Sequence, residues 1–126
     1  MKNRLGIIGG GQLGMMIAEA AQNLTDEISE ITVLDPTENC SAAQVGAKQI
    51  VGDFKDELAI LKLAGQSDII TYEIESGNTD VLSKLKAKIE PSPSTLGTIQ
   101  DKLSQKIFLS ENELPVSQFY EITSLG

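Results

Sequence analysis

A glycine-rich segment near the start of the chain constrains the fold more than any other feature. The stretch GIIGGGQLG (6–14) has the spacing G-x-G-x-x-G, follows the apolar run 4–8 and opens a helical pattern over Gln12–Asn23. Glycines permit the tight turn and close backbone approach that such a junction needs. Because the first N–H groups of a helix have no intrahelical acceptor, they can bind a phosphate group. The segment therefore predicts a strand, a glycine turn and a helix whose N-terminus faces a ligand.

Apolar runs alternate with helical patterns along the rest of the chain. The pattern predicts a loop with one helical turn at 37–46, an extended segment at 115–123, strands at 4–8, 30–35, 48–52, 67–75 and 89–93, and helices at 12–23, 55–66, 78–88 and 94–114. The last helical region divides into two segments near Gln100. This alternation predicts an α/β fold with a mainly parallel sheet and helices on both faces. The first strand of such a sheet commonly neighbours the fourth, and ligands bind beyond the carboxyl ends of the strands.

Composition narrows the classes of partner. The 126 residues suit one compact domain, and no apolar stretch approaches the length of a membrane span. The net charge of −8 argues against nonspecific binding to nucleic acid or to an anionic membrane. The chain has no histidine, which excludes imidazole chemistry by its own residues, and its single cysteine fits a reducing cytoplasm.

The glycine spacing by itself leaves the ligand open. Asp35 lies about 20 residues after the turn, where an acid holds the adenosine ribose in dinucleotide-binding domains. ATP or a small phosphorylated substrate would satisfy the same free N–H groups equally well. A turn that serves only close helix–strand packing is a further alternative.

Two later stretches carry charged residues that could face a ligand. In DIITYEIESGN (68–78), Thr71, Glu73 and Glu75 alternate, so they share one face if the strand continues. Carboxylates at a buried strand end suit a cation, an amine or a hydroxyl-rich ligand, although a solvated strand end is the ordinary alternative. Lys102 and Lys106 are four residues apart and share a helix face, which is more often simply solvated.

These stretches together resemble one family. GIIGGGQLG, VLDP…AAQVG, GDFKD, DIITYEIE and TIQDKLSQKIFL…LPV are similar, in order and spacing, to the N-terminal domain of 5-(carboxyamino)imidazole ribonucleotide synthase, an ATP-grasp enzyme of purine biosynthesis. The resemblance covers about residues 4–120. It implies a Rossmann-like, three-layer pre-ATP-grasp domain over 1–93, and a helical linker with a first extended segment over 94–126 that leads to ATP-grasp domains.

The resemblance also implies roles for individual residues. It implies that the ribonucleotide's 5′-phosphate meets the start of the first helix and that an acid of the fourth strand meets its ribose or amine. The residues concerned are Gly11, Gln12 and Leu13 for the phosphate, Glu73 and, as second choice, Glu75 for the ribose or amine, Asp35 as ribose contact or structural cap, and Lys102 for ATP. No residue of this chain is assigned as catalytic.

The family's reaction, as the resemblance implies, joins ATP, bicarbonate and 5-aminoimidazole ribonucleotide to give the N-carboxylated ribonucleotide, ADP and phosphate. ATP and Mg²⁺ would be held mainly by the domains that follow, and family members are often homodimers. By itself this chain is therefore expected to bind but not to carboxylate. The rival hypotheses are the NAD(P)-binding domain of an oxidoreductase and a non-catalytic nucleotide-binding domain.

Overall fold

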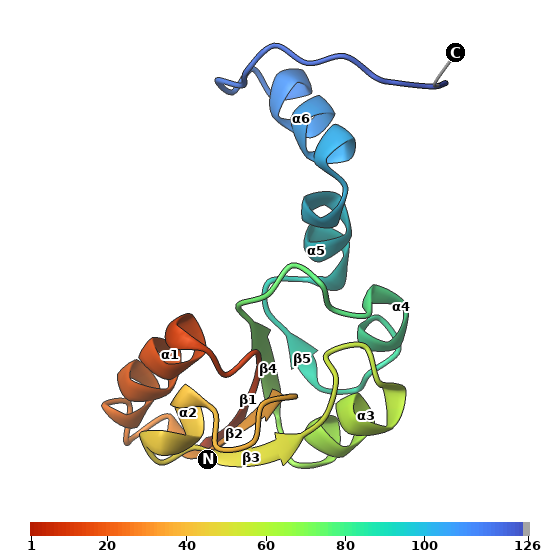
Figure 1. Ribbon diagram of the computed structural model, residues 1–126. Helices are drawn as coiled ribbons and strands as arrows, with labels where there is room; N and C mark the ends of the chain where they lie inside the picture. The colour runs from red at the N-terminus through yellow and green to blue at the C-terminus, as the bar shows by residue number, and fades with distance from the viewer. Residues whose placement is uncertain (125–126) are drawn as a thin grey trace.

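A computed structural model describes residues 1–124 of the chain and shows a five-stranded, wholly parallel sheet in the order β3-β2-β1-β4-β5 (Figure 1). The strands are β1 (Asn3–Ile8), β2 (Ile28–Asp35), β3 (Lys48–Val51), β4 (Ile69–Tyr72) and β5 (Lys88–Ile89). The helices are α1 (Gln12–Gln22), α2 (Ser41–Gln44), α3 (Glu57–Gly65), α4 (Thr79–Leu82), α5 (Pro93–Gln100) and α6 (Lys102–Glu111). The predicted fold class is confirmed, and β1 does lie beside β4.

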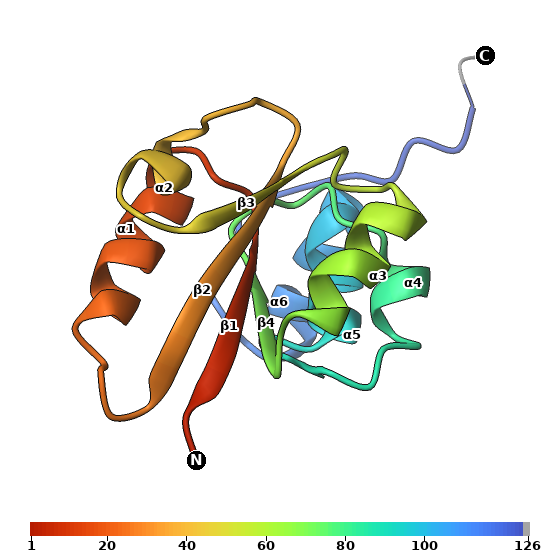
Figure 2. The same cartoon turned by 90° about the horizontal axis from the view of Figure 1, so that it is seen from below.

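The sheet is buried on both faces, which makes three layers. Figure 2 shows α1 and α2 on one side of the strands and α3 and α4 on the other. Successive residues of a strand point to opposite faces of the sheet. Ile7 packs with Ala18 of α1 and Ala42 of α2 on one face. Ile8 packs with Ile60 and Leu63 of α3 on the other face. This explains why the strands read as continuous apolar runs rather than as alternating ones.

Helix α1 packs on the sheet through small residues. Its buried residues are Gly14, Ala18 and Ala21, whereas Leu13 and Met16 are 57% and 53% exposed. The helix therefore lies close to the strands; Ile17 packs against the core, whereas Leu13 and Met16 are largely exposed to solvent.

Three elements are shorter than the sequence predicts. The helix expected over 78–88 is only one turn, α4, although Asn78 does cap it through a bond from the Val81 N–H. After Leu82, the Lys84 and Leu85 N–H groups donate to carbonyls three residues back, and Leu85 and Ala87 pack against the core, so the chain enters β5 at once. The expected strands 67–75 and 89–93 are likewise reduced to four and two residues.

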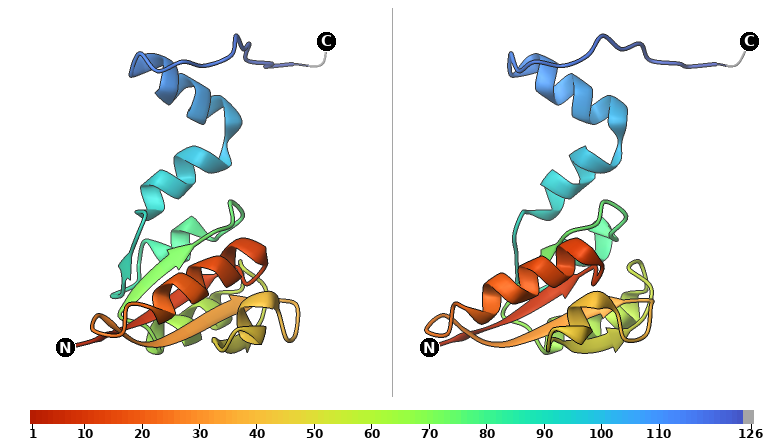
Figure 3. Two further views of the ribbon diagram at one scale, coloured as in Figure 1. Left: turned by 90° about the vertical axis from the view of Figure 1, so that its left-hand side faces the viewer. Right: turned by 60° about the vertical axis from the view of Figure 1, so that its left-hand side comes forward.

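The two helices that follow β5 form an arm, defined here as residues 93–124. As predicted, a helical region divides near Gln100, and Asp101 ends α5 and caps α6. Leu96 of α5 is buried in the core, but α6 has no buried residue and leads away from the sheet (Figure 3). The domain boundary at 93/94 stays a prediction.

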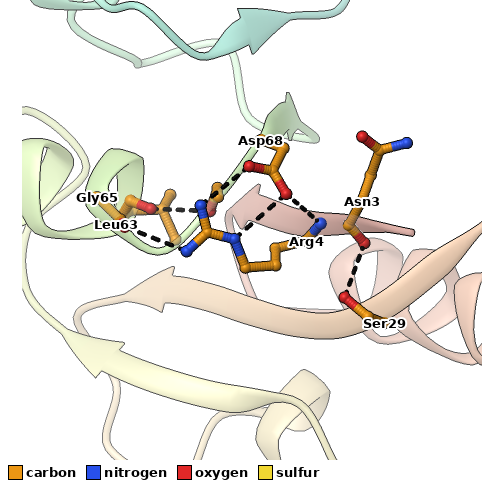
Figure 4. A network of polar contacts seen from close by, with 7 residues as sticks. Asn3, Arg4, Ser29, Leu63, Gly65 and Asp68 are labelled. Carbon is orange, nitrogen blue, oxygen red and sulfur yellow. Dashed lines mark hydrogen bonds and ion pairs between the residues drawn. The ribbon is translucent and has the colours of Figure 1, made fainter. Parts of the chain in front are cut away.

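At the amino ends of the strands, an ion pair joins β1 to the beginning of β4. The Arg4 guanidinium donates to both carboxylate oxygens of Asp68, at 2.9 and 3.2 Å, and to the Gly65 carbonyl (Figure 4). Asp68 also accepts from the Arg4 backbone N–H at 2.8 Å. These hydrogen bonds and the nearby positive charge lower the pKa of Asp68 to about 2. The pair lies at the amino end of β1, whereas the glycine turn lies at its carboxyl end.

Candidate functional site

The glycine turn connects β1 to α1 in a conformation that depends on its glycines. Gly9 has φ +104°, a value that residues with a Cβ rarely adopt, and its N–H donates to the Leu34 carbonyl at 2.9 Å. A Cβ on Gly14 would collide with the Gly9 carbonyl, so helix and turn can approach only at a glycine. Gly11 is the N-cap residue, and no side chain of residues 1–124 caps the helix. The first-turn N–H groups at Gly11, Gln12 and Leu13 therefore have no intrahelical acceptors.

Glu73 lies directly over this turn. The strand order places β4 beside β1, where the sheet's connections change direction, and this is where α/β sheets bind ligands. The Glu73 N–H donates to the Ile8 carbonyl at 3.1 Å, which extends the β1–β4 pairing by one residue. Its carboxylate contacts the position that a Cβ on Gly9 would fill, and its Oε1 lies 4.0 Å from the corresponding position on Gly11. The predicted meeting of the two motifs is present.

The environment of Glu73 disfavours its charge. Burial raises the pKa of the half-buried Glu73 carboxyl, and the nearby negative charge of Asp35 raises it further. Within residues 1–124 no hydrogen bond reaches this carboxylate. A half-buried acid without donors, beside a row of open N–H groups, is typical of a binding site.

Asp35, at the end of β2, is bound into the turn. The residue is 7% exposed, and its two carboxylate oxygens accept from the Gly10 and Thr37 N–H groups, both at 2.8 Å. Of the two roles implied for it, the structural cap is present in the structure. A contact with ribose stays a prediction.

Glu75 is separated from Glu73. Because β4 ends at Tyr72, the two acids do not alternate along a strand as expected. The Glu75 carboxylate instead lies 3.6 Å from Lys102 Nζ, and both side chains are well exposed. Glu75 lines an open cavity of about 380 Å³, together with Lys55, Ser76, Gly77 and Gln100. The structure therefore groups the predicted residues into two sets, one at the glycine turn and one at the junction of α5 and α6.

The sequence analysis missed the residues that form the other wall of the turn. A cavity of about 240 Å³ lies between the glycine turn and the segment from β2 to α2, lined by Gly10, Gly11, Asp35, Thr37, Asn39, Cys40, Ser41 and Gln44. Asn39 has φ 54°, in the left-handed region that asparagine tolerates better than most residues. Together with Pro36, this asparagine is a local signal in the sequence of a turn here.

Within residues 1–124, no three Asp, Glu or Cys side chains are grouped so that they could hold a metal ion. Among the same residues, no helix has the length and apolar character needed to cross a bilayer.

The order of the strands, the glycine turn and the open start of α1 define a Rossmann-like α/β domain with its candidate site at the point where the strand order reverses. A family model described as the ribonucleotide synthetase preATP-grasp domain matches residues 1–100. The chain belongs to this family.

Relatives with this domain are longer enzymes. The N5-carboxyaminoimidazole ribonucleotide synthase of Brucella melitensis is 43% identical over 110 residues, which are 86% of this chain and 30% of that protein. The crystal structure of the synthetase from Thermotoga maritima is 42% identical, with a TM-score of 0.87 over 98% of this chain and 34% of that one. The Aspergillus clavatus enzyme, crystallised with ADP and 5-aminoimidazole ribonucleotide, is 36% identical, with a TM-score of 0.82 over 93% and 31%. This chain therefore corresponds to the N-terminal third of these enzymes.

Proposed function

We propose that this chain is the ribonucleotide-binding, N-terminal part of an ATP-dependent ligase that carboxylates 5-aminoimidazole ribonucleotide with bicarbonate in de novo purine biosynthesis. The proposal is supported by membership of the family and by the relative that was crystallised with that ribonucleotide. It rests most directly on one observation. The half-buried carboxylate of Glu73 lies over the glycine turn, beside the open N–H groups of α1.

The two halves of this site suit the two ends of a sugar phosphate. The N–H groups of Gly11, Gln12 and Leu13 would bind the 5′-phosphate, helped by the partial positive charge at the start of a helix. Glu73 would accept hydrogen bonds from a ribose hydroxyl or from the substrate amine. These hydrogen bonds would satisfy the Glu73 carboxylate, which receives no hydrogen bond from residues 1–124. Binding would also favour the ionised form of Glu73, which opposes the effects of burial and of the Asp35 charge that raise its pKa.

The reaction then needs an activated carboxyl group. ATP would phosphorylate bicarbonate to carboxyphosphate and release ADP. The substrate amine would attack the carboxyl carbon, form the N–C bond, expel phosphate and lose a proton. This chain's part in these steps is to hold and orient the amine, since a correctly placed nucleophile lowers the barrier. ATP and Mg²⁺ would supply the phosphoryl chemistry.

Lys102 is the proposed ATP contact of this chain. It is the first residue of α6 and lies beside the open cavity bordered by Glu75. Glu75 would orient the lysine rather than touch the ribonucleotide. The pair is well exposed, so a polyphosphate can displace Glu75 from Lys102 at little energetic cost.

We place the protein in the cytoplasm as an enzyme subunit that functions with the ATP-grasp domains of its family, in a homodimer. Residues 1–126 by themselves are proposed to bind the ribonucleotide without turning it over. The NAD(P)-binding alternative keeps the glycine spacing in its favour, but the Asp35 oxygens that it requires for ribose already accept backbone hydrogen bonds.

A chimera tests the proposed function. Residues 1–126 would replace the matching N-terminal third of the Thermotoga maritima enzyme, and phosphate release would be measured with ATP, bicarbonate and ribonucleotide. We expect ribonucleotide-dependent turnover, and we expect Glu73→Gln to raise the KM for the ribonucleotide or abolish turnover. Glu27→Gln, at an exposed turn before β2, is the matched control and should change nothing. A folded chimera without turnover, or an active Glu73→Gln variant with unchanged kinetics, would contradict the assignment.

A further inference from the structure

The sequence leaves Asp35 with two incompatible roles, and its hydrogen bonds separate them. As a ribose ligand of a dinucleotide, the carboxylate would have to present its oxygens to the cleft. In the structure, Oδ2 accepts from the Gly10 N–H and Oδ1 accepts from the Thr37 N–H, both at 2.8 Å. The residue is 7% exposed. Both oxygens of the acid are therefore bound to backbone N–H groups of the glycine turn and of the segment after β2.

Gly10 is held from both sides. Its N–H is taken by Asp35, and its carbonyl accepts from the Ala42 N–H of α2 at 3.0 Å. The preceding N–H, of Gly9, is already bound to the Leu34 carbonyl at 2.9 Å. The turn is thus hydrogen-bonded residue by residue to the end of β2. The first N–H group left for a ligand is that of Gly11, where α1 starts.

We propose that Asp35 is the positioning and specificity-determining residue of the glycine turn: it holds the turn through the Gly10 N–H and is thereby unavailable to the ribose of a dinucleotide, which makes the turn a site for one terminal phosphate. A dinucleotide's adenosine ribose needs a free acid after the second strand. Asp35 is buried and both of its oxygens are bound to backbone N–H groups, so it does not supply that acid. One phosphate needs only the N–H groups from Gly11 onward.

The identity of the molecule that carries this phosphate, 5-aminoimidazole ribonucleotide, rests on the proposed function. The role of Asp35 in the turn does not. The two are therefore measured separately. Hydrogen exchange of the Gly10 amide, followed by nitrogen-15 NMR in the 126-residue chain without ligand, reports on the turn. Calorimetric titration with the ribonucleotide and, side by side, with NAD reports on binding.

The chain offers a closely matched control for Asp35→Ala. Asp53, just after β3, accepts from the N–H two residues on, Lys55, at 2.8 Å, as Asp35 does from Thr37. Asp53 makes no bond to the glycine turn among the described residues and is exposed. Asp53→Ala therefore removes a similar local turn contact and leaves Gly10 untouched. Asp35→Ser, which keeps one acceptor, replaces Asp35→Ala if that variant does not fold.

We expect Asp35→Ala to speed exchange at Gly10 and to weaken ribonucleotide binding by about tenfold or more, as expected for a lost hydrogen bond to a charged acceptor. Asp53→Ala should stay within about twofold of wild type, and the wild type should not bind NAD. Unchanged Gly10 exchange or unchanged ribonucleotide affinity in a folded Asp35 variant would overturn the proposal, as would NAD binding by the wild type. If neither wild type nor Asp53→Ala binds ribonucleotide while Asp35→Ala still frees Gly10, the proposed function fails and the positioning role stands.

Discussion

The sheet domain (residues 1–92) and the arm (93–124) use their apolar residues differently. Among residues 1–124, every buried hydrophobic residue except Leu96 belongs to the sheet domain. Helix α6 buries none, and Phe108 is 52% exposed beside an apolar cavity of about 390 Å³ between α5 and α6. The sheet domain is thus stabilised by its own packing, whereas α6 depends on little more than its cap and its own hydrogen bonds.

The same contrast separates the two halves of the candidate site. The turn, Asp35 and Glu73 are fixed by strand ends that the core holds rigidly. Lys102 and Glu75 are placed by an exposed ion pair and by one bond from Gln100 to the Gly77 carbonyl. We therefore expect the set of residues at the glycine turn to be preorganised in this chain. We expect Lys102, the proposed ATP contact, to be loosely placed.

The largest expected effect compares two apolar truncations. Leu34→Ala, at a fully buried position of β2, should lower the free energy of unfolding by about 2–5 kcal/mol. Phe108→Ala in α6 should change it by less than about 0.5 kcal/mol, because no packed core surrounds that side chain. Urea denaturation followed by far-ultraviolet circular dichroism measures both. Equal losses would show that the arm is part of one cooperative core.

A second comparison uses two glycines. Gly9→Ala should destabilise the sheet domain by about 1–3 kcal/mol, because alanine is strained at φ +104° and its Cβ would contact the Glu73 carboxylate. Gly97→Ala, in the middle of α5 with open space around it, should stabilise the protein by about 0.5–1 kcal/mol. The same denaturation experiment reads both. Opposite signs are the prediction, and a shared sign would contradict it.

A third comparison concerns the two glutamates. Because the pKa of Glu73 is raised in the folded protein, the folded state binds more protons than the unfolded one between the two pKa values, and stability falls as pH rises through that interval. Glu73→Gln should therefore be more stable than wild type near neutral pH. The difference should vanish below the unfolded pKa of a glutamate, about 4.3. Glu75→Gln, in the exposed pair, should show no comparable gain in thermal melts recorded against pH.

The smallest expected effects concern two aspartates: Asp68, which pairs with Arg4, and Asp101, which caps α6. Asp68, with its pKa lowered to about 2, contributes stability above its unfolded pKa that is lost as pH falls toward 2. Asp68→Asn should therefore lower the melting temperature modestly at neutral pH and hardly at all near pH 2. Asp101→Ala removes the side-chain acceptor that caps α6 and should reduce helical signal while leaving the unfolding midpoint of the sheet domain in place. A large midpoint shift in Asp101→Ala would couple the arm to the core.

The sequence predicted the layers, the pairing of β1 with β4 and the position of Glu73 at the turn, because these follow from local periodicity and from the general rules of parallel sheets. It predicted too long a helix after Asn78, because local spacing cannot show that the chain must turn to bring Leu85 into the core. It also placed Glu75 on the same face as Glu73, because the alternating pattern continues past Tyr72. The end of β4 is set by tertiary packing, which local alternation does not show.

The role of Asp35 could not be read from the sequence for a different reason. An acid at the end of a second strand can face the ligand space or the turn, and only the relative positions of Gly10 and Thr37 decide between them. The pairing of Lys102 with Glu75 likewise depends on how α5 docks through Leu96.

The central claim is that the start of α1 and Glu73 together bind a sugar monophosphate. Nitrogen-15 NMR of the 126-residue chain, titrated with 5-aminoimidazole ribonucleotide, tests it most directly. We predict saturable shifts of the Gly11, Gln12 and Leu13 amides that are lost in Glu73→Gln or markedly weakened. Shifts confined to other parts of the chain, or the same amides responding to NAD and not to the ribonucleotide, would contradict it.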